Sequence, residues 1–489
     1  MLKRVMVVYD DTVVADKLVK NITGPKSFGS TIFKRKTLKV RMRDALMSNN
    51  FIFDFLDYEK GNSVEDLAGA LKDVPANCAV MHLFSNYGIK DMEGFNLLLE
   101  KAQFINTNMM VMQQDKIMLV LFASVEEYMK YIKEHHNLEG QISFDKLKNY
   151  DVIHSDALVD LAELNNFMQF ITGGFDARFF NALEGDEYTV TKRSSNKKKI
   201  KSEYEFFYLL PDNMKMWFVM PFQYVEEDTY ASYTMERYHM TDIAIRWIHN
   251  AINLEEFNDI LKRLFRFVTN RNTKEVTLEE YETVEKNLYI TKVKERMEEL
   301  KKSSYYIKFN RFISSGTRFQ SIDEIIDKYE ALYATVKKNR KIKPELVVGH
   351  GDLCFSNILY NKETSMLKLI DPKGATKEEE LWTNPYYDIA KLSHSICGRY
   401  DFFNSGLYDI KIEADMKLNL SLEFNNAEYM ELFRDYLERY GFDYNMVRVY
   451  EASLFLSMLP LHMDNPQKVF GFLLNAINIL EEVEKCIQD

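Results

Sequence analysis

Two short apolar stretches near residue 350, each ending on polar side chains, constrain this chain more than any other feature. The first, "VVGH", is followed by Asp352 and, five positions later, by Asn357, and the second, "LKLI", ends on Asp371 fourteen positions further on. Apolar runs of this length beside turn residues are typical of buried strands. The two interpretations are a polar turn with an exposed aspartate, and a site built from three hard oxygen donors.

The second interpretation matches the needs of phosphoryl transfer. That reaction needs an oriented acceptor hydroxyl, a clamped triphosphate and Mg²⁺ held by oxygen ligands. The pattern H-x-D-x-x-x-x-N, followed by a strand that ends in aspartate, supplies a carboxylate for the hydroxyl and then two further oxygens for the metal. We expect His350 to brace the loop through hydrogen bonds and to take no part in the chemistry.

The segments "HGDLCFSNILYN" and "LKLIDPKG" resemble the catalytic region of aminoglycoside phosphotransferases and choline kinases, which are small-molecule kinases with the protein-kinase-like fold. The resemblance implies ATP as the phosphoryl donor, Asp352 as the catalytic base, and Asn357 and Asp371 as Mg²⁺ ligands. Gly351, where protein kinases have arginine, favours a small-molecule acceptor over a protein. Pro372, where protein kinases have phenylalanine, argues against an activation-loop switch of their type.

The same resemblance requires a lysine on a strand and a glutamate on the following helix to hold the phosphates. Lys192 lies at the end of the strand-like "EYTVTKRS", and Glu203 follows eleven positions later in the helical "KIKSEYEFFYLL". The alternatives are Glu205, which lies on a different face of that helix, and Arg193, which should point to the opposite face of the sheet. A solvated lysine with no role in the site is the remaining alternative.

Two further parts of the nucleotide site are assigned by position. Gly173 and Gly174 in "TGGFDARFF" would let a loop cover the phosphates, although an ordinary hairpin turn explains them equally well. The segment "FVMPFQ" would connect the two lobes, with the backbone from Met220 to Phe222 pairing with adenine. These residues complete the predicted ATP site.

The segment "ELWTNPYYDIAKLSHSICGRYDFF" resembles the family's region in which an aspartate braces the catalytic loop, which implies that role for Asp388. Trp382, Tyr386 and Tyr387 are candidates for an aromatic wall of the acceptor pocket, which would suit a quaternary ammonium group. Core or rim positions are the commoner alternative for these three residues. His394 has the spacing of a core histidine in a helix, which we prefer to a catalytic role.

The periodicity divides the chain into an α/β domain followed by an α+β two-lobed domain, for which the resemblance implies the protein-kinase-like fold. Residues 1–145 alternate buried strands, such as "RVMVVYD" and "CAVMHLF", with amphipathic helices. Residues 155–225 are predicted as an antiparallel sheet plus a helix, with three strands between 167 and 194. Residues 226–489 are predicted as a mostly helical lobe that contains the catalytic loop.

The opening strand and "GPKSFGSTIFKRKTLKVRMRDAL" resemble sugar- or choline-phosphate nucleotidyltransferases, which implies a kinase fused to a domain that activates its product with CTP. The glycine-rich G-x-G-x-R loop of that family is missing, since "YDDTVVADK" follows the first strand. Asp54 and Asp57 are candidate metal ligands, but exposed carboxylates are the commoner explanation. A degenerate nucleotide-binding fold used for packing or assembly is therefore the preferred interpretation.

Bulk properties argue against several other classes of protein. The net charge of −11 argues against a broad basic face for nucleic acids. Cys78, Cys354, Cys397 and Cys486 show no C-x-x-C spacing, which argues against a zinc site or a disulfide framework and fits a reducing cytosol. No apolar window approaches the ~18 residues of a membrane span. A cytoplasmic protein without a membrane span is expected.

The sequence therefore predicts an ATP- and Mg²⁺-dependent kinase that acts on a hydroxyl group of a small molecule. The phrase "YDIAKLSHSICGRYDFF", after an I-D-P-basic-G motif, resembles phosphotransferases of bacterial surface-polysaccharide pathways. That resemblance implies a sugar, polyol, choline or similar capsule building block as the acceptor. The alternatives are a non-catalytic pseudokinase that serves as a nucleotide-binding scaffold, a bifunctional kinase–nucleotidyltransferase, and a protein kinase.

Overall fold

The computed structural model shows that the chain forms two compact units. The first contains residues 1–179 and 249–251, and the second contains residues 180–248 and 252–489. The structure describes residues 2–33, 35–134, 147, 149–171, 183–185, 188–338, 340, 342–422 and 424–488. Within these ranges, no helix is both long enough and apolar enough to cross a membrane.

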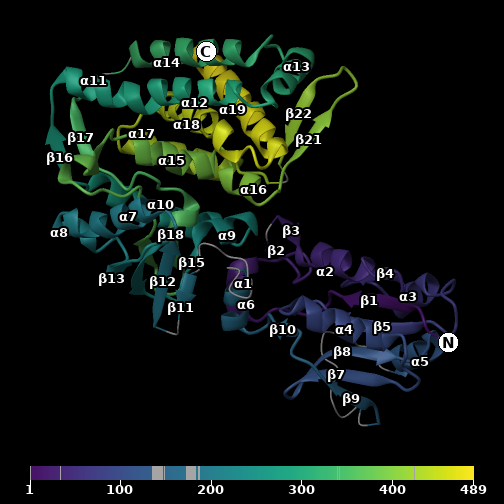
Figure 1. Ribbon diagram of the computed structural model, residues 1–489. Coiled ribbons are helices and arrows are strands. Elements are labelled where there is room, and N and C mark those ends of the chain that lie inside the picture. Colours follow the sequence, from purple (N-terminus) through teal and green to yellow (C-terminus); the bar gives the residue numbers. More distant parts are fainter. Residues whose placement is uncertain are drawn as a thin grey trace. The chain divides into compact units, whose positions relative to one another are not determined.

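The first unit is built on a six-stranded mixed sheet. The strand order is β4 (Ile52–Tyr58), β1 (Val5–Asp10), β5 (Ala79–Phe84), β8 (Lys116–Phe122), β7 (Met109–Gln113) and β9 (Asp151–His154). Figure 1 shows β1, β5, β8 and β7 side by side. β1 runs parallel to both of its neighbours, whereas β8 runs antiparallel to β5 and β7. The predicted sheet of the N-terminal region is therefore present, with parallel pairing among β4, β1 and β5 and also between β7 and β9.

Helices cover both faces of this sheet. Alternate residues of each buried strand face opposite sides of the sheet, so each strand contributes side chains to two cores. Val5 and Val7 share a core with residues of α2 (Leu38–Met47) and α4 (Met92–Ala102). Met6 shares the other core with residues of α3 (Val64–Ala70) and α5 (Val125–Glu134). Burial on both faces explains why the strand "VMVVYD" is apolar at nearly every position.

Residues 151–171 lie with the first unit, beyond the limit at residue 145 that the sequence suggested. β9 pairs with β7, and β10 (Leu158–Asp160) pairs with β6 (Tyr87–Ile89). The prediction that a strand begins at Phe167 was wrong, because Phe167 and Phe170 are three positions apart and are buried together on the helix α6 (Leu164–Ile171). The other elements of this unit are α1 (Lys17–Thr23), β2 (Ile32–Phe33) and β3 (Lys36–Thr37).

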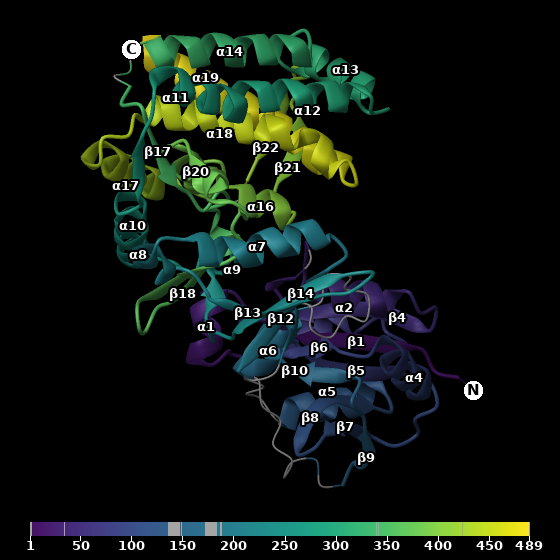
Figure 2. The ribbon, with the colours of Figure 1, turned by 60° about the vertical axis from the view of Figure 1, so that its left-hand side comes forward.

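The second unit begins with a four-stranded antiparallel sheet and one covering helix. The sequence predicted a sheet and a helix within residues 155–225, but the observed sheet extends to residue 236. The strand order is β11 (Leu183–Gly185), β12 (Thr189–Ser194), β14 (Ala231–Glu236) and β13 (Pro221–Glu226). The helix α7 (Lys197–Leu209) lies along the sheet (Figure 2) and packs on it through Ile200, which shares a buried cluster with Ala231 and Tyr233.

The connection from this sheet to the helical region is at residues 237–242, so the prediction that placed it from Met220 to Phe222 was wrong. Phe222 lies inside β13, and Met220 directly precedes that strand. The chain leaves the sheet only after β14. The segment "MWFVMPF" divides between two places. Phe218 forms a bridge with Leu369, whereas the last two residues of the segment belong to β13.

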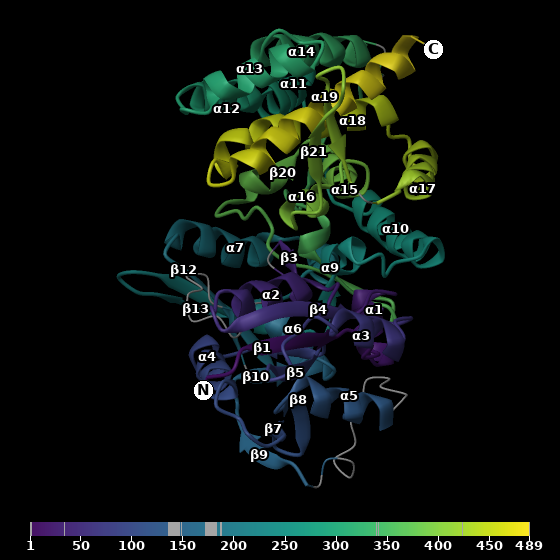
Figure 3. The ribbon, with the colours of Figure 1, turned by 90° about the vertical axis from the view of Figure 1, so that its right-hand side faces the viewer.

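A set of helices forms most of the remainder of the second unit. They are α8 (Asp212–Lys215), α9 (Ile243–Ile248), α10 (Leu254–Thr269), α11 (Leu278–Lys286), η2 (Asn287–Thr291), α12 (Lys292–Lys301), α13 (Tyr306–Gly316), α14 (Ile322–Lys338), α15 (Tyr387–Ile396), α16 (Tyr400–Asn404), α17 (Ala427–Arg439), α18 (Tyr444–Met458) and α19 (Pro466–Gln488). α18 is almost entirely buried and contacts α12, α14, α15 and α19. Figure 3 shows α17 beside α10, which it also contacts.

Two small sheets within this helical region carry the predicted catalytic residues. One has the order β16 (Thr273–Glu275), β17 (Glu345–Val348) and β20 (Trp382–Thr383), and the other has the order β15 (Thr241–Asp242), β18 (Ile358–Asn361) and β19 (Met366–Leu369). A separate hairpin consists of β21 (Asp409–Ile412) and β22 (Leu418–Ser421). Asp352 lies in the loop that joins β17 to β18, and Asp371 lies just after β19.

Candidate active site

A buried aspartate on α15 fixes the loop between β17 and β18. Asp388 is fully buried, and its two carboxylate oxygens accept hydrogen bonds from the backbone N–H groups of His350 (2.9 Å) and Gly351 (2.9 Å). Arg271, which is also buried, donates from Nη1 to this carboxylate at 2.9 Å and compensates its charge. Asp388 therefore makes the bracing contact that the sequence predicted.

The hydrogen bonds of the His350 ring indicate which of its two nitrogens carries the proton. Its Nδ1 accepts from the N–H of Asp352 at 3.1 Å, so we assign the proton to Nε2, which donates to the carbonyl of Ile370 at 2.9 Å. Burial lowers the pKa of His350, and its ring stacks on Phe218. His350 therefore links the catalytic loop to the strand end that precedes Asp371.

Both the backbone conformation at position 351 and the space around it require glycine there. Its φ of +80° lies in the left-handed region, and an added Cβ would lie 2.6 Å from Cβ of Lys373. The N–H of Lys373 also donates to the carbonyl of His350 at 2.9 Å, which holds the two segments together. A larger residue at position 351 would force this contact apart.

Both carboxylate oxygens of Asp352 have partners within the site. Nδ2 of Asn357 donates to the Asp352 carbonyl (2.9 Å) and to its Oδ2 (3.2 Å), and Nζ of Lys391 lies 2.9 Å from Oδ1. Burial raises the pKa of this carboxyl group, but Lys391, His350 and Asn357 together outweigh burial, and the net pKa lies below its ordinary value. The Asp352 side chain is still 43% exposed. Asp352 is therefore an ionised, accessible carboxylate that can accept a proton.

Asn357 and Asp371 present the oxygens that would suit a metal. The N–H of Ile370 donates to the carbonyl of Asn357 at 3.0 Å, which places the residue before Asp371 beside Asn357. Because Nδ2 of Asn357 faces Asp352, its Oδ1 faces away from that residue. An amide oxygen and a carboxylate fit Mg²⁺, which commonly takes its other ligands from phosphates and water. No set of three or more His, Cys, Asp or Glu in the described ranges could hold a metal, so these two residues would need the phosphates as further ligands.

Lys192 connects the sheet to the catalytic region through two ion pairs. Its Nζ lies 2.7 Å from Oε2 of Glu203 on α7 and 2.8 Å from Oδ1 of Asp371. The Glu203 side chain is 1% exposed, and its Oε2 also accepts from the hydroxyl of Tyr233 at 3.1 Å. Burial opposes the charge of Lys192, but the carboxylates of Asp371 and Glu203 outweigh it and raise its pKa. Lys192 is therefore a fixed cation beside Asp371.

The structure also decides between Lys192–Glu203 and the alternatives that the sequence left open. The guanidinium of Arg193 lies 3.4 Å from the ring centroid of Tyr230, away from the Lys192 contacts. The carboxylate of Glu205 lies 3.8 Å from Nζ of Lys201 on the same helix. Neither alternative reaches the group formed by Lys192, Glu203 and Asp371.

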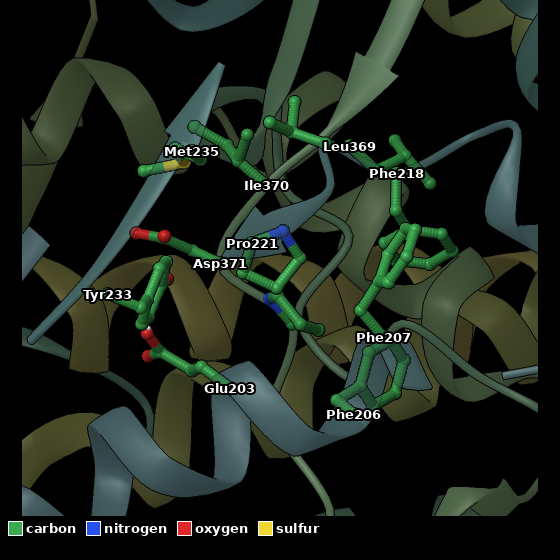
Figure 4. A pocket seen from close by; sticks show the side chains of 12 residues that line it. Glu203, Phe206, Phe207, Phe218, Pro221, Tyr233, Met235, Leu369, Ile370 and Asp371 are labelled. Carbon is green, nitrogen blue, oxygen red and sulfur yellow. Dashed lines mark hydrogen bonds between the residues drawn. The ribbon is translucent and has the colours of Figure 1, made fainter. Parts of the chain in front are cut away.

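A small apolar cavity lies beside the carboxylates of Glu203 and Asp371 (Figure 4). It has a volume of about 20 Å³, and its lining includes Phe206, Phe218, Leu369 and Ile370 together with Glu203, Tyr233 and Asp371. That volume is close to the space that one water molecule occupies. The cavity therefore forms an apolar backing for the ion pairs and is too small for a nucleotide base.

A second, larger cavity lies beside the loop between β17 and β18. It has a volume of about 220 Å³ and is lined by residues 349–351, Lys373, Trp382 and Tyr387, among others. Two of the three predicted wall residues therefore face a cavity. The third, Tyr386, is buried, and the guanidinium of Arg340 lies 4.5 Å from its ring centroid.

Other predicted residues lie away from this group or cannot be placed. Gly173 and Gly174 lie outside the described residues. Met220 is 50% exposed, and neither Met220 nor Phe222 lines either of the two cavities. His394 is fully buried and stacks on Tyr400 in the helical core, as predicted. The expectation that its ring nitrogens are satisfied was wrong, because neither has a hydrogen-bond partner among the described residues.

Lys391 is the main residue of the site that the sequence interpretation missed. It lies on α15, one helical turn after Asp388, in "YDIAKLSHSI". A lysine three positions after a buried aspartate, within an otherwise apolar stretch, is a signal for a second polar contact on the same helix face. Arg271 was missed as well, since its pairing with Asp388 spans more than one hundred residues of sequence.

Comparisons with known proteins give distant matches only. No family model and no curated protein matches the chain. Among solved structures, a thermostable mutant of aminoglycoside phosphotransferase APH(4)-Ia in its apo form is 11% identical, with 61% of this chain and 92% of that chain covered and a TM-score of 0.36. The streptomycin–ATP–APH(2")-IIa ternary complex is 13% identical, with 61% and 86% covered and a TM-score of 0.34.

A different protein is matched over a shorter part of the chain. HddC from Yersinia pseudotuberculosis is 9% identical, with 36% of this chain and 100% of that chain covered and a TM-score of 0.24. TM-scores this low decide neither the fold nor the function of this chain. We therefore derive its function from the contacts of the site.

Proposed function

We propose that this chain is an ATP- and Mg²⁺-dependent phosphotransferase that phosphorylates a hydroxyl group of a small molecule. The observation that carries the proposal is the contact of Lys192 with both Glu203 and Asp371 (2.7 and 2.8 Å), which joins a strand, a helix and a strand end distant in sequence. This is the lysine–glutamate pair and metal aspartate that phosphoryl transfer by protein-kinase-like enzymes requires.

The residues of the site then take separate roles. Lys192, held by Glu203, binds the phosphates of ATP as a cation. Asp371 and Asn357 would hold Mg²⁺ through hard oxygens, and the ion would supply positive charge beside the phosphates. Asp352 orients the acceptor hydroxyl and accepts its proton.

The adenine base is assigned to the connection after β14. Residues 237–242 lead from the four-stranded sheet to α9, so they connect the sheet of the second unit with its helical region. In the kinase-like arrangement that we propose, their backbone takes the role that the sequence interpretation gave to Met220 and Phe222. A loop containing Gly173 and Gly174 as a cover for the phosphates stays a prediction.

The acceptor that fits best is a small polyhydroxylated metabolite, such as a sugar or polyol. A quaternary ammonium acceptor would need aromatic rings free of other cations. Arg340 lies over Tyr386, and Nζ of Lys292 lies 5.8 Å from the ring centroid of Tyr387. These two rings therefore already have cations of the chain beside them, which disfavours choline at this wall. The resemblance to surface-polysaccharide phosphotransferases implies sugars and polyols as well as choline, so the cations beside this wall are the argument that favours the first two.

The experiment that tests the proposal is a coupled assay of ADP release at saturating Mg·ATP. The panel contains amino sugars, neutral sugars, polyols, hydroxy amino acids, ethanolamine and choline. We expect acceptor-dependent ADP release with at least one sugar or polyol, and loss of that release in Asp352→Asn. A wild-type chain that binds Mg·ATP but releases no ADP with any acceptor would favour the nucleotide-binding scaffold, and a chain that binds no Mg·ATP would contradict the proposed function.

A further inference from the structure

Lys391 is the charged group beside the candidate active site to which the roles above assign no function. Its Nζ lies 2.9 Å from Oδ1 of Asp352, and its side chain is only 14% exposed. Burial opposes the charge of Lys391, but Asp352, with smaller contributions from Tyr387 and Cys354, outweighs burial and raises the pKa of Lys391, so the lysine is protonated. A lysine so largely withdrawn from water is rare unless a charge partner compensates it.

The contact belongs to a helix that already controls the catalytic loop. Asp388, three positions before Lys391 on α15, binds two backbone N–H groups of the loop. The same helix face therefore holds the loop twice, through its backbone at His350 and Gly351 and through the side chain of Asp352. Placing the loop and orienting its carboxylate are separate tasks, and α15 has one side chain for each.

The two partners of Asp352 together fix the plane of its carboxylate. Lys391 is on Oδ1, and Nδ2 of Asn357 is on Oδ2 at 3.2 Å. An ionised carboxylate has about four lone-pair sites, so these contacts leave sites for an acceptor hydroxyl. Without Lys391, the carboxylate could rotate about its last side-chain bond, and Asn357 alone would restrain it.

We propose that Lys391 is a positioning residue for phosphoryl transfer, which holds the Asp352 carboxylate in the orientation that receives the acceptor hydroxyl. The inference rests on the proposed function. Misplacement of a reacting group by about 1 Å can cost on the order of 10²-fold in rate. Lys391 contacts neither Lys192 nor Asp371 in the structure, so its effect belongs to the acceptor side of the reaction and leaves nucleotide binding unchanged.

The test measures steady-state ADP release with the acceptor found in the panel, together with calorimetric binding of a non-hydrolysable ATP analogue and Mg²⁺. Lys391→Met is expected to lower kcat by about 10²-fold, while analogue affinity and KM for ATP change less than about twofold. Lys391→Arg restores the cation and is expected to recover a large part of the lost kcat. Lys294→Met is the matched control, because Lys294 pairs with Glu330 at 2.9 Å on the surface.

Three results would overturn the inference. Lys391→Met with wild-type kcat would show that the carboxylate needs no such support. A parallel loss of analogue binding would assign Lys391 to the nucleotide instead. Equal losses in the Met and Arg variants would show that the charge is irrelevant. Lys391→Gln provides a second neutral variant if the Met variant does not fold.

A thermal-unfolding cycle tests the contact without any activity. Lys391→Met, Asp352→Asn and the double variant should be non-additive, because each single change removes the same ion pair. Additive shifts in Tm would contradict the contact itself. A wild-type chain that binds no Mg·ATP would contradict the proposed function, whereas an active wild type with an unaffected Met variant would contradict only the role of Lys391.

Discussion

Both units contain strands that end on aspartates, but they use those carboxylates in different ways. In the first unit, Asp10 at the end of β1 is fully buried, and its oxygens bind the backbone and hydroxyl of Thr12 and Nε2 of His82. In the second unit, Asp371 after β19 is 38% exposed and Asp352 is 43% exposed. The same sequence pattern therefore produces a structural carboxylate in one unit and an accessible carboxylate in the other.

Asp11 shows the same internal use of charge in the first unit. Its two oxygens accept from the hydroxyl of Ser27 (2.7 Å) and the N–H of Gly29 (2.8 Å), so it fixes the loop that precedes β2. Asp57 lies 3.5 Å from Nζ of Lys39, and Asp54 is exposed. These contacts favour a packing role for Asp10 and Asp11, in agreement with the missing glycine-rich loop. The difference teaches that a strand-end aspartate marks a site only when the chain's own donors leave it accessible.

The largest expected effect is that of Asp352→Asn on catalysis. Removing the proton acceptor should lower acceptor-dependent ADP release by about 10²–10⁴-fold, while the affinity for Mg·ATP stays within about threefold. ADP release and calorimetric binding measure the two effects separately. A variant that kept more than a tenth of the wild-type rate would contradict the contrast between the two units, because Asp352 would then resemble the structural aspartates of the first unit.

The second effect concerns Asp401, a buried carboxylate of the second unit. Burial raises the pKa of Asp401 to about 7 from an ordinary value of 3.8, so the folded chain favours the neutral acid. Its contribution to stability is complete below about pH 4 and is lost as the pH rises through 7. Asp401→Asn should therefore be more stable than wild type at pH 8 by on the order of 2–4 kcal/mol, with a smaller difference at pH 5.

Denaturant unfolding at both pH values measures this difference. Asp409→Asn is the control, because Asp409 lies on β21 with a side chain that is 61% exposed. Glu451, whose pKa burial also raises to about 7, is present in all three chains and cancels. An equal change in both variants, or a difference that shrinks toward pH 8, would show that burial does not raise the pKa of Asp401.

The third effect is that of Lys192→Met on stability and on nucleotide binding. The variant leaves Glu203 buried without its closest cation, which should cost about 2–3 kcal/mol, and should weaken Mg·ATP binding at least about tenfold. Lys199→Met is the matched control, because Lys199 lies 3.6 Å from Oε1 of Glu203 but is 59% exposed. Equal effects of the two variants on nucleotide affinity would remove Lys192 from the phosphate site.

The smallest expected effect comes from the first unit. Asp11→Ala removes the acceptor for Gly29 and Ser27 and should lower the free energy of unfolding by about 1–2 kcal/mol. It should leave the affinity for Mg·ATP and the rate of ADP release unchanged, because the site lies in the second unit. A loss of nucleotide binding with intact stability would mean that the aspartates of the first unit also serve a ligand.

Local patterns were enough to predict part of this architecture. The resemblance pointed to Lys192 and Glu203, which are eleven residues apart on consecutive elements, and Nζ of Lys192 lies 2.7 Å from Oε2 of Glu203. Asp352, Asn357 and Asp371 follow from a short motif whose two strands pair as a hairpin. The role of Asp388 followed from resemblance, and its two hydrogen bonds to the loop agree with it.

Long-range packing explains what the sequence did not reveal. The contact of Lys391 with Asp352 depends on how α15 lies against the catalytic loop, which no local period specifies. The connection after β14 was misplaced because Phe218 pairs with Leu369, a partner far away in sequence. The sequence interpretation considered only the carboxylates of the segment that forms β4. Its sequence, "IFDFLDY", mixes acidic and apolar residues, although the strand pairs in parallel with β1.

The most direct test of the central claim is calorimetric binding of a non-hydrolysable ATP analogue, with and without Mg²⁺, to the wild type, Asp371→Asn and Asp57→Asn. We predict that Mg²⁺ strengthens binding to the wild type and to Asp57→Asn, and that Asp371→Asn loses this dependence on the metal. Absence of binding to the wild type, or an unchanged dependence on Mg²⁺ in Asp371→Asn, would contradict the assignment of the second unit as a phosphotransferase.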